Sequence, residues 1–211
     1  FGVNIQLPFE QLPNIYIEND PKLVTFKYFF TRKLIFVKET DAIALFPGGF
    51  GTLDEMFESL TLLQTGKSDI MPIVLIDVPG GTYWLEWRRY LEKYLMKRGL
   101  ISSEDMHFFK MTDNVDVAVR EVTGFYRNFH SSRYLGDQLV IRLQRPISDV
   151  LLGKLNDGFK DIVTQGRIDR AAAFREESDE PDLIHLPRLK LRFNRKNFGR
   201  LRQLIDALNA E

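Results

Sequence analysis

Cysteine is absent from the 211 residues of this chain, and histidine occurs only three times. The lack of cysteine excludes disulfides, thiolate metal sites and cysteine nucleophiles, and it is typical of proteins from a reducing interior, so we expect a cytoplasmic protein. His107, His130 and His185 are scattered and lack the i, i+4 spacing of a helical zinc motif. They are better interpreted as ordinary surface or core residues, so we assign no metal to them.

Long apolar runs and a net charge are also missing. No run approaches the roughly 20 residues needed to cross a bilayer. The 29 basic and 29 acidic residues cancel, so no global field attracts nucleic acid or an anionic membrane. A hydrophobic content of 44% allows the chain to bury a core, and the length suits one domain with a smaller appendage. We therefore expect neither a membrane nor a nucleic-acid partner.

The chain opens "FGVNIQLPFEQLPN", without an initiator methionine and without the basic and apolar regions of a signal peptide. Its first residues already predict a strand. We therefore expect earlier strands of the same sheet in a preceding segment.

Strand-like and helix-like runs alternate through about residue 127, which predicts a parallel sheet with helices on its faces. The apolar run 42–46, "AIALF", is expected to be a central strand buried on both faces. Strands are expected at 3–7, 24–30, 42–46, 72–78 and 108–112, and helices at 32–40 (capped by Thr31), 53–64, 82–98 and 114–127, with a short helix from Ser102 or Ser103. The aromatic residues of 82–98 fall at helical spacing, so we expect them to pack on the sheet.

The pattern changes after residue 127. Strands are predicted at 134–145, 166–174 and 186–193, and helices at 146–163 and 195–209, with a polar acidic loop at 176–182. This is a βαββα order, a small α+β unit. We therefore predict two domains, an α/β domain over 1–127 and an α+β extension over 128–211.

Residues 188–202 contain seven basic side chains and no acidic one. One interpretation is a pair of solvated strand and helix faces, and the other is a patch that binds nucleic acid or a nucleotide. The neutral chain as a whole favours the first.

The stretch 45–58, "LFPGGFGTLDEMFE", places Gly48, Gly49 and Gly51 between a buried strand and a helix. That position is the carboxyl edge of a parallel sheet, where open α/β folds bind ligands. Backbone N–H groups near 49–53 and the positive helix end favour an anion such as a phosphate. The lysine of a Walker motif is absent, so this is not an ATPase loop of that kind.

A purely structural alternative exists for the same residues. Thr52-Leu53-Asp54-Glu55 fits a capping box, in which Thr52 caps the helix and Glu55 reaches back to its backbone. The box by itself requires neither Gly48 nor Gly49. We therefore favour a binding loop.

Two motifs together resemble a known family. "PGGFGTLDE" matches the signature PGGxGTxxE, and the pair Arg32-Lys33 lies 23 residues ahead of Glu55. With these motifs the chain resembles the LONELY GUY family, nucleoside 5′-monophosphate phosphoribohydrolases that are often mislabelled as lysine decarboxylases. The resemblance covers roughly residues 2–127.

The resemblance implies a Rossmann-like doubly wound fold and hydrolysis of the N-glycosidic bond of AMP or N6-isopentenyl-AMP, as in cytokinin biosynthesis, to a free base and ribose 5-phosphate. It implies no cofactor, and a homodimer or higher homo-oligomer. Carried over by position, Arg32 and Glu55 are the catalytic pair, Lys33 and Glu58 are possible substrate contacts, and the phosphate is held by Gly48, Gly49, Gly51 and Thr52.

The implied chemistry suits these residue types. Cleavage of the C1′–N9 bond builds positive charge on the ribose, which the Glu55 carboxylate can stabilise while it orients or deprotonates a water. An arginine holds its proton too tightly to be an ordinary general acid, but Arg32 can bind phosphate bidentately.

The sequence departs from the family in two places. The family's first strand and its early glycine loop are not found, and the portion after about 130 exceeds the family core, as a dimer or regulatory module would. One alternative is a Rossmann-type protein that binds a nucleotide or the molybdenum cofactor without hydrolysis, which the presence of both Arg32 and Glu55 argues against. Another is a nucleic-acid-binding module that uses residues 188–202.

Overall fold

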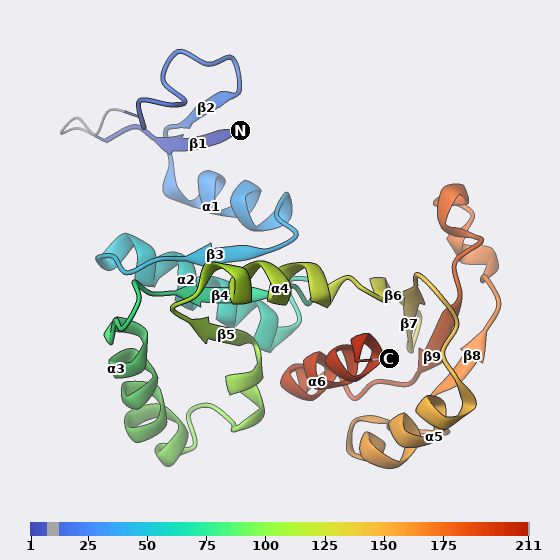
Figure 1. Cartoon of the computed structure of the whole chain (residues 1–211). Coiled ribbons are helices and arrows are strands. Elements are labelled where there is room, and N and C mark those ends of the chain that lie inside the picture. The colour runs from blue at the N-terminus through green and yellow to red at the C-terminus, as the bar shows by residue number, and fades with distance from the viewer. Residues whose placement is uncertain (8–12, 211) are drawn as a thin grey trace. The chain divides into compact units, whose positions relative to one another are not determined.

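The computed structural model describes residues 1–7 and 13–210, which form two compact units, Phe1–Asp41 and Ala42–Glu211 (Figure 1). Both contain parallel strands and helices, which confirms a mixed α/β fold. The division into domains at residues 127 and 128 stays a prediction.

The first unit holds a two-stranded parallel sheet and one helix. Strands β1 (Gly2–Ile5) and β2 (Leu23–Phe26) pair in parallel, and α1 spans Phe29–Lys38. The predictions of a strand through residue 30 and of a cap at Thr31 were wrong, because the helix begins at Phe29 with Tyr28 as its N-cap residue. The Thr31 hydroxyl instead donates to the Tyr28 carbonyl at 2.8 Å from inside the first turn.

The second unit contains a parallel sheet of order β3-β4-β5. Its strands are Ile43–Leu45, Ile73–Ile76 and Phe109–Thr112. All four residues of β4 are buried, so β4 is the central strand of this sheet. Within the second unit β3 is the outer strand of this sheet and Ala44 is exposed, so the central position predicted for 42–46 stays a prediction. An apolar run indicates burial but does not give a strand's place in a sheet.

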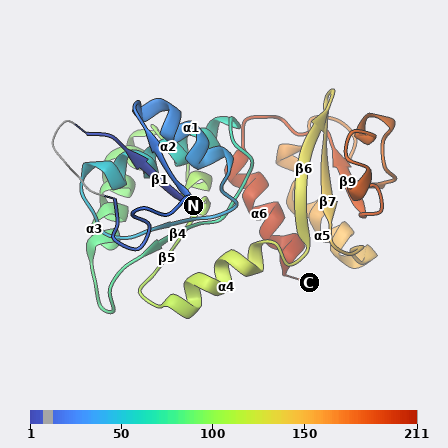
Figure 2. The ribbon, with the colours of Figure 1, turned by 90° about the horizontal axis from the view of Figure 1, so that it is seen from above.

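Three helices accompany this sheet: α2 (Phe50–Thr65), α3 (Tyr83–Tyr90) and α4 (Val115–Phe125). Figure 2 shows α4 beside the strands of this sheet, and its Ala118 packs on Val74 and Ile76 of β4. The aromatic residues that begin the predicted helix 82–98 pack as expected, because Trp84 and Trp87 are buried and the Trp84 indole donates to the Ile76 carbonyl at 3.1 Å. Farther along, Tyr90 and Tyr94 are exposed.

The C-terminal part is built on an antiparallel sheet of order β6-β7-β9-β8. Its strands are Phe129–Leu135, Gln138–Leu143, Asp169–Ala171 and Arg188–Leu191, and its helices are α5 (Asp149–Gly158) and α6 (Phe198–Asn209). The single strand predicted over 134–145 was wrong, because the chain reverses in a two-residue hairpin loop in which Gly136 has a φ of 60°. The order is therefore ββαββα.

Helix α6 joins the two sheets of the second unit. Both views place it between the parallel sheet and the C-terminal sheet (Figures 1 and 2), and it contacts α2, α4, α5, β6 and the short helix η3 (Glu104–His107). Its apolar residues Leu201, Leu204 and Leu208 are buried. A side chain at Gly199 would meet the Glu104 carbonyl oxygen at 2.3 Å, so only glycine allows this approach.

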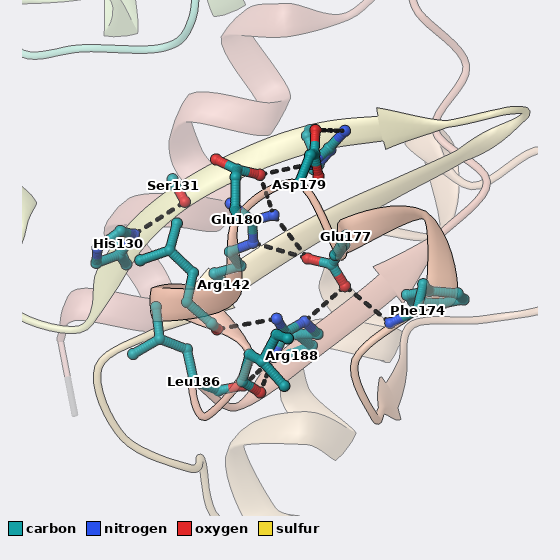
Figure 3. Close-up of polar contacts among 12 residues, drawn as sticks. His130, Ser131, Arg142, Phe174, Glu177, Asp179, Glu180, Leu186 and Arg188 are labelled. Carbon is teal, nitrogen blue, oxygen red and sulfur yellow. Dashed lines mark hydrogen bonds and ion pairs between the residues drawn. The ribbon is translucent and has the colours of Figure 1, made fainter.

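A buried ion cluster holds the C-terminal sheet together (Figure 3). Arg142 of β7 and Arg188 of β9 face each other in register and are 2% and 3% exposed. Glu177, which is fully buried, bridges them, with Arg142 Nη2 at 2.7 Å from one carboxylate oxygen and Arg188 Nε at 2.8 Å from the other. Glu180 accepts a further hydrogen bond from Arg142 at 2.6 Å. The carboxylates compensate two arginines that would otherwise repel each other.

This cluster corrects two expectations. The acidic loop 176–182 is not merely polar and solvated, because it supplies buried Glu177. The basic run 188–202 is not a solvated face throughout, since Arg188 and Arg202 are buried. Several of its cations are held in ion pairs, among them Arg192 with Asp137 and Arg200 with Asp161. Charges that are neutralised within the chain do not support a nucleic-acid patch.

We expect Glu177→Gln to lower the free energy of unfolding by about 3 kcal/mol, because it leaves two buried arginines without their shared countercharge. Urea unfolding measures the change. Glu176→Gln, one residue away on an exposed side chain, is the matched control and should have no comparable effect. Equal effects of the two variants would show that the cluster does not stabilise the fold.

The same carboxylate makes stability depend on pH. Burial raises the pKa of Glu177, but hydrogen bonds from the Phe174 N–H, Arg188 and Arg142 outweigh it and hold this pKa below its ordinary value of 4.5. A lowered pKa contributes stability above the unfolded-state value, and this contribution is lost as the pH falls. The stability difference between the wild type and Glu177→Gln should therefore shrink as the pH falls below 4.5. A difference that stays constant from pH 7 to pH 3 would contradict this.

Candidate functional site

The candidate site lies at the carboxyl edge of the parallel sheet in the second unit. Because β3, β4 and β5 run in the same direction, the loops that follow Leu45, Ile76 and Thr112 all leave from this edge. The first of these loops carries the glycines of the PGGFGT motif, as the sequence predicts.

The glycine loop leads directly into α2. The helix begins at Phe50, with Gly49 as its N-cap residue. The capping-box alternative was therefore wrong, because Thr52 is already the third helical residue and Gly49 has no side chain to cap with. The backbone N–H groups of Phe50, Gly51 and Thr52 belong to the first turn, where the helix offers no carbonyl to accept them. They lie at its positive end, which suits an anion.

Gly48 is fixed from two sides. A side chain at this position would meet the Thr52 hydroxyl oxygen at 2.2 Å, so any residue other than glycine would force Thr52 to move. The Tyr83 hydroxyl, from the start of α3, donates a hydrogen bond of 2.7 Å to the Gly48 carbonyl. Tyr83 thus positions the loop, a role that its helical spacing did not reveal.

Gly49 and Gly51 have open space where a side chain would stand, since no described atom lies within 4 Å of a Cβ built at either position. Neither residue has a positive φ. Gly51 lies inside α2, where glycine costs about 0.5 to 1 kcal/mol relative to alanine. Gly51 is only the second residue of the helix, so this helix-interior value is an upper limit there. Neither packing nor backbone conformation requires glycine at this position, and the open space leaves room for a ligand to approach the backbone.

The predicted carboxylates follow on the same helix. Thr52, Glu55 and Glu58 recur at intervals of three residues and are all half-buried, so they lie along one side of α2. The next turn is tied to this side, because the Ser59 hydroxyl donates to the Glu55 carbonyl at 2.7 Å. Asp54 is exposed. The structure therefore groups Glu55 and Glu58 with the glycine loop.

Arg32 and Lys33 lie on α1 of the first unit and are both half-buried. They are neighbours on one helix, whereas the glycine loop and Glu55 belong to the second unit. The pairing of Arg32 with Glu55 stays a prediction.

Two acidic residues that the sequence analysis did not select shape the neighbouring loops. Asp77, directly after β4, accepts a hydrogen bond from the Val78 N–H at 2.9 Å, and a Cβ at Gly81 would meet its carboxylate at 2.2 Å and force it to move. Asp113, directly after β5, accepts from the Gly80 N–H at 3.0 Å. Asp113 directly follows the predicted strand 108–112, which was the available signal, whereas Asp77 falls inside the predicted strand 72–78, which concealed it.

Within residues 1–7 and 13–210, no group of three or more histidine, aspartate or glutamate side chains is arranged to hold a metal ion. Nor does any helix in that part of the chain have the length and apolar character needed to span a membrane.

The chain is similar to a protein family and to several named proteins. A family model described as possible lysine decarboxylase matches residues 1–122, more than half of the chain. A protein from Mycobacterium tuberculosis named cytokinin riboside 5′-monophosphate phosphoribohydrolase is 37% identical over 89 residues, which are 42% of this chain and 46% of that protein. An Arabidopsis thaliana protein of the same name, LOG1, is 30% identical over 94 residues, 44% of this chain and 42% of that protein. The matched part is thus less than half the length of these relatives.

Two glycine variants test the geometry of the loop. Gly48→Ala should lower the free energy of unfolding by about 1 to 3 kcal/mol, because the new methyl group forces Thr52 to move. Gly51→Ala should raise it by up to about 1 kcal/mol, because the site is open and alanine favours the helix. Urea unfolding compares the two, and a larger loss for Gly51→Ala than for Gly48→Ala would contradict the structure.

Proposed function

Because the chain belongs to the LONELY GUY family, whose model is described as possible lysine decarboxylase, we propose that it is a nucleoside 5′-monophosphate phosphoribohydrolase. The substrate is AMP or an N6-modified AMP, and the products are the free base and ribose 5-phosphate. The names of the relatives support this activity. The observation that carries the proposal is the open glycine loop at the start of α2, with two carboxylates on the same helix.

The loop holds the 5′-phosphate in this proposal. Gly49 and Gly51 leave space for the phosphate to approach the backbone, and the first-turn N–H groups donate to its oxygens. The Thr52 hydroxyl, directed toward Gly48, adds a donor on the same turn. Tyr83 keeps Gly48 in place through its hydrogen bond to the carbonyl. This arrangement gives a reason for glycine at position 51, where alanine would favour the helix.

Glu55 acts on the sugar. As the C1′–N9 bond breaks, its electron pair leaves with the base and positive charge develops on the ribose, which a nearby carboxylate stabilises. Glu55 also orients the water and accepts its proton as the oxygen bonds to C1′. The proton that Glu55 took from the water then passes to N9 of the departing base, which restores the carboxylate and completes the hydrolysis. Glu58, one turn farther along α2, contacts the ribose hydroxyls.

Arg32 and Lys33 of α1 supply positive charge to the substrate in this proposal. The planar guanidinium of Arg32 binds a phosphate through two parallel hydrogen bonds and thereby fixes the substrate's pose. Lys33 makes a further substrate contact. We also propose a Rossmann-like doubly wound arrangement of the α/β part, a homodimer or higher homo-oligomer, and a cytoplasmic location. No cofactor takes part in this chemistry.

The activity is tested by incubating the protein with AMP, GMP, CMP and N6-isopentenyl-AMP and following the free base by chromatography. We expect base release from AMP or its N6-modified form. Glu55→Gln should reduce the rate at least a hundredfold, because the loss of general acid–base catalysis typically costs a factor of about 10² to 10⁴. Asp54→Asn, the exposed neighbouring carboxylate, is the control and should retain activity. Equal rates for wild type and Glu55→Gln would remove Glu55 from the mechanism.

Gly51→Ala separates binding from folding in the same assay. The variant is expected to be at least as stable as the wild type, yet its added methyl group stands where the phosphate is placed. Its KM should rise or its activity disappear. If the wild type releases no base but a nucleotide raises its melting temperature, the protein is a nucleotide-binding protein without hydrolase activity.

A further inference from the structure

A cavity lies in the second unit, at the amino edge of the parallel sheet, away from the glycine loop. It has a volume of about 360 Å³, and its lining includes Phe109 and Lys110 at the amino end of β5. The glycine loop is at the carboxyl edge of the same sheet. Residues from η3, α4 and the C-terminal segment that includes α6 complete the lining, so the cavity lies where the C-terminal helix meets the α/β part. Its volume is within the range of small-molecule sites.

Arg202 of α6 is the buried charge of this cavity, with its side chain 4% exposed. Its Nη2 atom is 2.7 Å from Glu121 of α4, and its Nε atom is 2.9 Å from Asp206. The guanidinium carbon lies 4.7 Å from the centre of the Phe125 ring. Nη1 is buried, and within the described part of the chain it has no hydrogen-bond partner. A buried donor without an acceptor costs about 1 to 3 kcal/mol, which a bound acceptor would relieve.

The other charges of the lining favour an anion. Lys110 and Arg120 line the same cavity and are exposed, and within the described part of the chain neither forms an ion pair with a carboxylate. Glu121 and Asp206 balance Arg202 and one further charge, so the three cations exceed the two carboxylates by one. A ligand with acceptor oxygens and negative charge would pair the unpartnered donor of Arg202 and would also neutralise the excess positive charge.

We propose that this cavity is a second binding site, for a small oxyanion of the phosphate or carboxylate class. Arg202 Nη1 donates to the ligand, and Lys110 and Arg120 supply the charge that attracts it. The proposal does not depend on the hydrolase activity, because none of these residues belongs to the glycine loop or to α2.

The site would couple two parts of the second unit. Its residues come from η3, β5, α4 and α6, so a bound anion bridges the parallel sheet and the helix that packs against the C-terminal sheet. A ligand that binds only the folded state stabilises it in proportion to its occupancy. Anion binding should therefore raise the melting temperature and strengthen the docking of α6.

The test requires that the glycine loop be silenced first, because it is also expected to bind phosphate. Gly49→Asp does this without a steric clash, since Cβ has open space there and aspartate is a preferred N-cap residue, while its charge repels an anion. In this background, isothermal titration calorimetry with inorganic phosphate and, separately, with succinate measures binding to the second site and distinguishes the two kinds of oxyanion.

We expect at least one of the two anions to bind the Gly49→Asp protein, and the added double change Lys110→Gln and Arg120→Gln to weaken that binding at least tenfold. These two side chains are exposed, so the variant should fold. Lys67→Gln with Lys97→Gln removes the same charge elsewhere and should leave binding unchanged.

Two results would overturn the proposal: no binding of either anion to the Gly49→Asp protein, or equal weakening by both double variants. Either would mean that the Phe125 ring alone accommodates Arg202 Nη1. Base release by the wild type is measured separately, so failure of this site and failure of the hydrolase activity are distinguishable.

Discussion

The docking of α6 is the interaction on which the second unit depends. One face of this helix presents Leu201, Leu204 and Leu208 to the interior, and Gly199 allows its first turn to reach the backbone at Glu104. Arg202, on the same helix, is held to α4 through Glu121. Burial of each leucine side chain contributes roughly 1.5 to 3 kcal/mol, whereas the ion pair fixes the orientation of the helix. Helix α6 thus packs against both the α/β part and the C-terminal sheet.

Buried arginines are also neutralised by carboxylates inside the C-terminal sheet. Arg142 and Arg188 lie opposite each other on neighbouring strands, a placement that would be destabilising by itself. Glu177 reaches them from a loop that is distant in sequence from β7 and gives one carboxylate oxygen to each. A buried pair of this kind is weak evidence for added stability, but the loss of one member is costly. The acidic loop is therefore part of the sheet's structure and not a solvated connection.

At the candidate site, stability and function make different demands. Gly48 is constrained by the chain itself, because Thr52 occupies the space of a side chain. Gly51 is not, and alanine would favour the helix there. Residues that break a local rule without a structural gain are expected at functional sites. The contrast between two glycines only three positions apart is what supports phosphate binding by the loop, beyond the motif alone.

Local patterns were enough to predict the alternation of strands and helices, the glycine loop after β3 and the carboxylates of α2, because hydrophobic period, glycine spacing and motif are local properties. Two errors were local as well: Gly136-Asp137 is a hairpin turn signal that splits the predicted strand, and α2 begins at Phe50, so Thr52 does not cap it. The order of the strands in the sheet depends on pairing between distant segments, and within the second unit it places β4 in the middle. Only the tertiary structure buried Arg188 and Arg202, since their partners Glu177 and Glu121 lie on other elements. A run of like charges in sequence does not tell which of them will meet a carboxylate in space.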